Sequence, residues 1–158
     1  MTLLSVIIPT YNVASKISAC LTSLDDLKSV VEDVEVIFVD DHSTDDTFAV
    51  VCEYADSRDW VVPIRLDVNN GTPSTPRNRG LEEASGEFVF HLDPDDEILP
   101  AGVEKELEIA RQSGADLVRA PLVRDNGISQ TVMNRLDGWS DDLSTCLLYT
   151  SPSPRDRG

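Results

Sequence analysis

The chain has 158 residues, the size of one ordinary domain with a single core. Its 13 lysines and arginines face 29 aspartates and glutamates, which gives a formal net charge of -16 at pH 7. This balance argues against nucleic acid or an anionic membrane surface as a general partner, because both bind through basic patches. No apolar run approaches the ~18 residues of a membrane span and no charged leader opens the chain, so we expect a cytoplasmic location.

Three cysteines are widely spaced and form no CxxC pair, so neither a disulfide framework nor a zinc site is indicated.

Two apolar runs predict the first strands of the fold. The run 3–8 ends at Pro9, and the run 34–39 ends at Asp40 and Asp41, as expected of strands that are covered on both faces.

Helical spacing of apolar residues predicts a helix over 14–24, with Asn12 or Ser15 as its cap. A second helix should run through Tyr54, with Ser43 or Thr44 as its cap. We expect its inner face to consist of Phe48, Val51, Cys52 and Ala55.

A third strand fits 61–66, where Pro63 indicates a sheet edge. A turn at 69–73 leads to a short helix that carries Arg77, Asn78 and Arg79 near its start and turns Leu81 and Ala84 inward. Beyond residue 100 we expect a helix with Val103, Leu107 and Ala110 on one stripe, ended by Gly114, then a fifth strand over 116–120. Periodicity fades after the turn signal at 125–127.

The segment 86–97 combines a strand pattern with an acidic cluster. Four of the five residues 88–92 are apolar, which fits a buried strand, and Pro94 bars its continuation. The clustered acids Asp93, Asp95, Asp96 and Glu97 repel one another, and a divalent cation would stabilise them. The alternative is a solvated acidic turn.

Alternating strands and helices predict an α/β fold, a mostly parallel sheet with right-handed crossovers and helices on both faces. The chain should reverse its winding between the first strand and the strand at 88–92. The polar loops at 9–12, 40–43 and 93–96 would then lie side by side at one sheet edge, where open α/β sheets bind ligands.

Four segments in this order, 5–12, 36–45, 76–80 and 86–96, carry a family resemblance. Together they resemble the successive signatures of family 2 glycosyltransferases, which have the Rossmann-like GT-A nucleotide-sugar-binding fold. The resemblance covers about residues 3–123. The runs 92–97 and 114–118 are similar to bacterial enzymes that decorate cell-wall or capsular polymers, including teichoic-acid glycosyltransferases.

The resemblance implies transfer of a sugar, with inversion, from a nucleotide diphosphate donor, usually UDP-linked, to a glycan or cell-envelope polymer. By position, it implies that Pro9, Thr10 and Tyr11 line the nucleoside pocket and that Asp41 accepts a hydrogen bond from the base, with Asp40 beside it. Asp93 and Asp95 match the DxD element, which holds Mn²⁺ or Mg²⁺ against the diphosphate, as suits carboxylates and a hard cation. Arg77 or Arg79 would supplement the metal, since a guanidinium matches phosphate oxygens.

Two departures from the family pattern stand out. His42 occupies a position that is often Gly in the family, and no convincing general base lies between residues 125 and 145, where Asp141 and Asp142 lack a positioning element. We therefore expect a nucleotide-sugar-binding domain over 1–125 and the start of a truncated acceptor-side segment over 126–145. The tail 146–158 resembles translated sequencing-adaptor sequence, so we expect a truncated chain that is inactive alone and whose parent acts in the cytoplasm or at the inner membrane face.

Each residue also has a structural interpretation. Tyr11 could cover the sheet edge, both arginines could pair with surface acids, and His91 could be a packed strand residue. Two other functions are open. A non-catalytic nucleotide-sugar-binding module would lack only the base and acceptor site. A phosphoacceptor signalling domain would need a lysine after the fifth strand, whereas the lysines are Lys16, Lys28 and Lys105.

Overall fold

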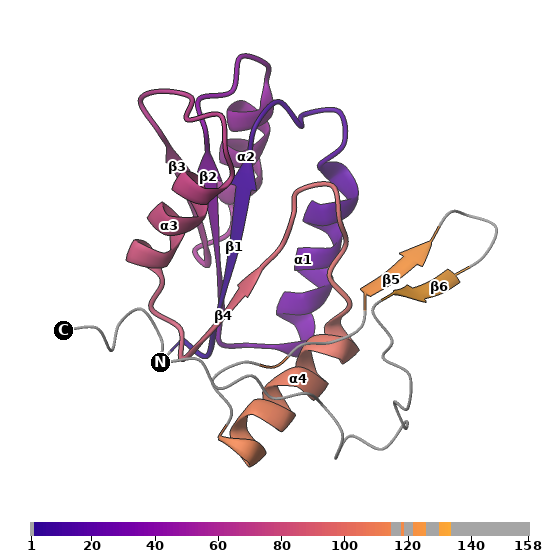
Figure 1. Ribbon diagram of the computed structural model, residues 1–158. Coiled ribbons are helices and arrows are strands. Elements are labelled where there is room, and N and C mark those ends of the chain that lie inside the picture. Colours follow the sequence, from indigo (N-terminus) through magenta and orange to yellow (C-terminus); the bar gives the residue numbers. More distant parts are fainter. Residues whose placement is uncertain (1, 115–117, 119–121, 126–129, 134–158) are drawn as a thin grey trace. The chain divides into compact units, whose positions relative to one another are not determined.

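The computed structural model describes residues 2–114, 118, 122–125 and 130–133, which divide into two units at Pro100 (Figure 1). The first unit contains one parallel sheet of four described strands in the order β3-β2-β1-β4. The strands are β1 (Leu4–Thr10), β2 (Val34–Asp40), β3 (Val61–Arg65) and β4 (Phe88–His91). The predicted parallel sheet, the edge position of Pro63 and the reversal between β1 and β4 are confirmed.

The two central strands form the core of this sheet. Every residue of β1 is buried, and β2 differs only at Glu35, which is half-buried. By contrast β4 was expected to be buried, and this prediction is wrong: it is the outer described strand beside β1, and Val89 and His91 are exposed. Apolar content alone does not distinguish a central strand from an outer one.

Helices lie on both faces of the sheet, as predicted. The helix α3 (Ser74–Glu83) approaches one face so closely that a Cβ on Gly80 would collide with the side chain of Ile7. Ile7 stands in register with Ile37, so Phe38 points to the opposite face. There its ring meets the edge of Tyr54 from α2 (Thr47–Ala55), with 6.2 Å between the centroids.

The predicted start of the first helix is wrong. The helix α1 (Ser18–Val30) begins four residues after Ala14, and no side chain caps Ile17 at its start. Asn12 caps nothing in α1. Its Oδ1 instead accepts hydrogen bonds from the backbone N–H groups of Thr44 (2.8 Å) and Asp45 (3.3 Å).

The next two helices also differ in detail. The carboxylate of Asp45, rather than Ser43 or Thr44, accepts a hydrogen bond from the first N–H of α2, at Thr47 (3.0 Å). The buried residues of α2 are Thr47, Val51 and Tyr54, so of the expected inner face only Val51 is fully buried. The buried residues of α3 are Pro76 and Gly80 instead of Leu81 and Ala84, because the close approach to β1 requires small side chains.

The second unit contains α4 (Pro100–Ser113), whose buried residues are the predicted Val103, Leu107 and Ala110. Gly114 follows with φ 65°, the left-handed conformation that ends many helices. Two strands that were not predicted, β5 (Leu122–Asp125) and β6 (Gln130–Met133), pair antiparallel.

The predicted strand 116–120 falls outside the described residues except for Val118, which is not in a strand. The segment 134–158, with Asp141, Asp142 and the adaptor-like tail, is also outside them. Among the helices that the structure describes, none is long and apolar enough to cross a membrane.

Candidate functional site

A cavity of about 380 Å³ opens at the carboxyl end of the sheet in the first unit. Its walls come from the ends of β1, β2 and β4, from the loop after β3 and from the first turn of α3. The lining residues are Pro9, Thr10, Tyr11, Asp41, Asn69, Gly71, Thr72, Pro73, Pro76, Arg77, Asp93, Pro94 and Asp95.

Seven of the residues expected at a donor site line this cavity: Pro9, Thr10, Tyr11, Asp41, Arg77, Asp93 and Asp95. Two others do not. Asp40 is buried behind the wall, and Arg79 forms ion pairs along its own helix with Glu82 and Glu83. Sequence reasoning treated Asn69, Gly71 and Thr72 only as turn residues. Their place directly before a helix that carries an arginine was the available signal.

Asp40 supports the cavity wall from within the protein. Its carboxylate accepts hydrogen bonds from the backbone N–H of Ser43 at 2.9 Å and from the Ser43 hydroxyl. The Thr10 hydroxyl reaches it at 3.5 Å, and Arg65 Nε forms an ion pair with it at 3.5 Å. A carboxylate that is only 1% exposed needs such partners.

Asp41 is buried as well, yet its side chain forms part of the cavity wall. Both carboxylate oxygens accept the backbone N–H of Asn70 at 3.0 Å, and one also accepts the Asn70 side-chain amide at 2.7 Å. The backbone of Asp41 is fixed on both sides, by Thr10 O at 2.8 Å and by the Asn69 side-chain amide at 3.1 Å. Asp41 is therefore held in place before any ligand arrives.

The loops after β1 and β2 hold one another. The backbone N–H of Asn12 donates to the Ser43 hydroxyl at 3.0 Å, and that of Val13 donates to the Thr47 hydroxyl at 2.8 Å. Asn12 and His42 adopt positive φ values of 51° and 61°. This left-handed conformation explains why the family pattern often has Gly at the position of His42.

The acidic loop is held less firmly at its acidic residues. Asp93 and Asp95 are exposed, and Arg77 Nη2 donates to Asp93 Oδ1 at 2.6 Å. Burial, followed by the charges of Asp95 and Asp93, raises the pKa of Asp96. Arg77 Nε is buried and has no hydrogen-bond partner among the residues that the structure describes. The cavity wall thus carries two exposed carboxylates, one of them paired with Arg77, and beside them the buried Arg77 Nε–H that lacks a partner.

A divalent cation fits these carboxylates. The described part of the chain contains no group of three or more His, Cys, Asp or Glu residues that could hold a metal alone. Mg²⁺ and Mn²⁺, however, accept one or two carboxylates when ligand phosphates and water complete the shell. Asp93 and Asp95 would hold such a cation, and the unsatisfied Nε of Arg77 would meet a phosphate oxygen.

The model of the family described as "Glycosyl transferase family 2" matches residues 5–143 of the chain. Poly(ribitol-phosphate) beta-glucosyltransferase of Bacillus spizizenii is 35% identical over 149 residues, which are 93% of this chain and 24% of that protein. Poly(ribitol-phosphate) beta-N-acetylglucosaminyltransferase TarS of Staphylococcus aureus is 32% identical over 148 residues, 92% and 26% of the two chains. The chain therefore spans about a quarter of the length of these curated relatives.

Solved structures of S. aureus TarS 1–349 are similar to this fold, with 35% sequence identity. The complex with UDP has a TM-score of 0.67, with 73% of this chain and 34% of that chain covered. The complex with UDP-GlcNAc has a TM-score of 0.65, with 73% and 33% covered.

Proposed function

The chain belongs to glycosyl transferase family 2, and from this premise we propose that it is the donor-binding part of an inverting transferase. Its donor is a UDP-sugar and the acceptor of its parent is a glycan or cell-envelope polymer. The support for the polymer is that two relatives are named for poly(ribitol-phosphate), and the support for the donor is that TarS has been solved with UDP and UDP-GlcNAc.

One observation carries the proposal: a preformed, buried carboxylate and an exposed carboxylate pair line the same cavity. Asp41 is fixed by Asn70 and would accept a hydrogen bond from an N–H group of the base. Tyr11 lines the same cavity, is 47% exposed and would offer its ring face to the nucleobase. Pro9 and Thr10 form the adjoining part of the cavity wall.

The diphosphate would lie at the other side of the cavity. Asp93 and Asp95 would hold Mn²⁺ or Mg²⁺, whose chemistry there is to neutralise the charge that develops on the departing diphosphate. Arg77 would donate its free Nε–H to a phosphate oxygen. Arg79 would contribute only by leaving Glu82 and Glu83, so Arg77 is the stronger candidate.

Inversion also needs a general base that removes the proton of the acceptor hydroxyl. We propose that this base is absent from the chain, and that 126–145 is the start of a truncated acceptor-side segment. The chain alone would then bind donor without transferring sugar. A non-catalytic binding module would share this behaviour, and restoring the rest of the parent sequence would separate the two. The family match favours both over a phosphoacceptor domain.

The direct test is calorimetric titration of UDP into the purified chain with Mn²⁺ and again with EDTA, with GDP and CDP as controls. We expect selective binding of UDP that strengthens in Mn²⁺. In the proposal Asp41 accepts a hydrogen bond from the base, and Asp93 and Asp95 hold the metal ion against the diphosphate. A folded chain that binds the three nucleotides equally, or ignores the metal, would contradict the proposal.

A further inference from the structure

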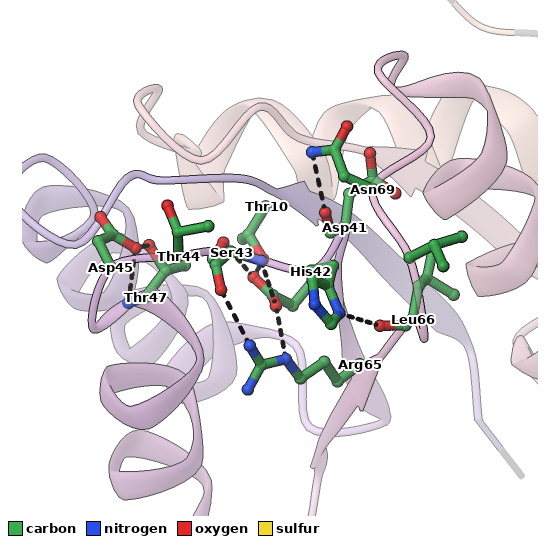
Figure 2. Close-up of polar contacts among 12 residues, drawn as sticks. Thr10, Asp41, His42, Ser43, Thr44, Asp45, Thr47, Arg65, Leu66 and Asn69 are labelled. Carbon is green, nitrogen blue, oxygen red and sulfur yellow. Dashed lines mark hydrogen bonds and ion pairs between the residues drawn. The ribbon is translucent and has the colours of Figure 1, made fainter.

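Arg65 lies outside the cavity wall, at the carboxyl end of the outer strand β3. Its guanidinium turns back toward the loop after β2, as Figure 2 shows. One Nη donates to the backbone carbonyl of Ser43 at 2.9 Å, and Nε forms the ion pair with Asp40. The guanidinium carbon also stands 5.3 Å from the ring centroid of Phe48 in α2, which fixes the side chain's direction.

The residue after Arg65 contacts the same loop. The backbone N–H of Leu66 donates to Asp40 O at 2.9 Å, and its carbonyl lies 3.1 Å from His42 Nδ1. The end of β3 therefore contacts three of the four residues of the turn 40–43, all except Asp41. Asp41 is the residue of this turn that lines the cavity.

Two features of the turn 40–43 cost free energy, so contacts from outside the turn are needed to stabilise it. His42 holds a left-handed φ of 61°, which costs a non-glycine residue roughly 1 kcal/mol or more. Asp40 buries a carboxylate at 1% exposure, and among the described residues Arg65 is the cation in contact with it. Removal of the guanidinium would leave a buried charge without a counterion and release the Ser43 carbonyl. Asp41 lies in the same turn, directly after Asp40 and two residues before Ser43.

From these contacts we infer that Arg65 is a positioning residue for nucleobase recognition. It contacts no ligand itself and acts by fixing the turn that aims Asp41 into the cavity. The inference rests on the proposed function and deepens it, because it assigns part of the base selectivity to a residue outside the pocket.

The test compares Arg65→Met and Arg65→Lys with the unaltered chain. Methionine keeps an aliphatic stem over Phe48 and removes the charge, whereas lysine keeps the charge and loses the two-point geometry. Titrations use UDP, GDP and inorganic pyrophosphate, each with Mn²⁺, and circular dichroism monitors folding. The exposed Arg111→Met on α4 is the matched control, with wild-type behaviour expected.

For Arg65→Met we expect about a tenfold loss of UDP affinity and a similar fall in the preference for UDP over GDP, with pyrophosphate affinity within about twofold of wild type. Arg65→Lys should retain part of the preference for UDP over GDP that Arg65→Met loses. If the methionine variant does not fold, the lysine variant alone tests the inference. Unchanged selectivity in both variants would overturn the inference and leave the proposed function standing. A parallel loss of UDP and pyrophosphate would also overturn it, since general loosening explains that result. A wild-type chain without UDP binding overturns both proposals.

Discussion

Glu35 at the amino end of the parallel sheet and the acidic loop after β4 at its carboxyl end differ in how completely the chain satisfies their carboxylates. At the amino end, Glu35 accepts hydrogen bonds from the Ser5 hydroxyl (2.6 Å) and from the backbone and hydroxyl of Ser85 (2.7 and 3.0 Å). At the carboxyl end, the exposed Asp93 forms an ion pair with Arg77, and the exposed Asp95 has no ion-pair partner among the described residues.

The pKa values express the same contrast. Burial pushes the pKa of Glu35 upward, but hydrogen bonds from Ser5, Ser85 and Gly86 outweigh it and hold the pKa below its ordinary value. The pKa of Asp96 is raised by burial and by its acidic neighbours. A carboxylate that the chain itself satisfies holds the fold together, whereas carboxylates that face one another leave room for a cation.

The two ends of the sheet also differ in how tightly they are packed. A Cβ on Gly86 would lie 2.6 Å from the Ser5 hydroxyl and 2.7 Å from its backbone nitrogen, so the Glu35 group is closely packed. The carboxyl end instead opens into the cavity. The comparison therefore predicts that substitutions around Glu35 at the amino end alter the free energy of unfolding. Substitutions in the acidic loop at the carboxyl end should instead alter the affinity for UDP.

The largest effect should come from Asp95→Asn, which keeps the shape of the side chain and removes its charge. We expect UDP affinity in Mn²⁺ to fall by about 100-fold, toward the value in EDTA, because one of two metal carboxylates is lost. The unfolding free energy should stay equal or rise slightly, since a like charge near Asp96 disappears.

Calorimetry in Mn²⁺ and in EDTA measures the affinity, and urea unfolding measures the stability. Equal losses of affinity in both buffers would show that Asp95 does not act through a metal, and a large loss of stability would break the contrast between the two sheet ends.

The complementary change is Glu35→Ala at the amino end. It leaves the N–H of Ser85 and the Ser5 hydroxyl without their acceptor, so the unfolding free energy should fall by about 2 kcal/mol. UDP affinity of the folded variant should stay within about twofold of wild type, because the cavity lies at the other sheet end. Urea unfolding checks the first value and calorimetry the second.

Glu53→Ala, at an exposed carboxylate of α2, is the matched control for Glu35→Ala. A loss of UDP affinity in Glu35→Ala comparable to that of Asp95→Asn would mean that the two ends are coupled through β1 and β2.

A smaller effect is expected on the pH dependence of stability, through the carboxyl group of Glu35. The pKa of Glu35 is lower in the folded chain than in the unfolded one, so its stabilisation is present above the unfolded value of about 4.3. It is lost as pH falls from there through the folded pKa. The stability gap between wild type and Glu35→Gln should therefore shrink between about pH 5 and pH 3, by less than about 1 kcal/mol because Glu35 is partly exposed.

Urea unfolding at several pH values measures this gap. A gap that stays constant across the range, or widens as pH falls, would show that the Glu35 charge does not stabilise the fold.

The parallel sheet and its winding could be predicted because local patterns determine them. Apolar strands alternate with helices, Pro63 signals an edge, and the loops after β1, β2 and β4 reach one sheet end by topology alone. The helix starts were harder. Asn12 has the side chain of a cap, but it bonds across to Thr44 in a loop more than thirty residues away, which no local rule anticipates.

The candidate site was predictable as a set of positions and not as a set of contacts. Tyr11, Asp41, Arg77 and Asp93 line one cavity as the resemblance implied. The resemblance assigned the base contact to Asp41 and placed Asp40 beside it, but it did not indicate that Asp40 supports the wall from behind while Asp41 lines the cavity. That division depends on the left-handed turn at His42 and on Arg65, which tertiary structure supplies.

The pairing of Arg77 with Asp93 is another contact of this kind, and it leads to the smallest expected effect. In the ligand-free chain the guanidinium neutralises a carboxylate that a metal would need, at 2.6 Å, and so competes with free Mn²⁺. Arg77→Met should therefore raise the affinity for Mn²⁺ alone by about threefold, while it lowers the affinity for UDP in Mn²⁺ because a phosphate donor is lost.

Calorimetry with the metal alone and then with UDP measures these opposite changes, and Arg111→Met again provides the control. If both affinities fell, Arg77 would be needed to hold the acidic loop in shape; if both rose, it would not be a phosphate ligand. Opposite signs from one substitution would instead indicate that Arg77 occupies the place of the cation until the nucleotide arrives, so that metal and diphosphate bind together at the carboxyl end of the sheet.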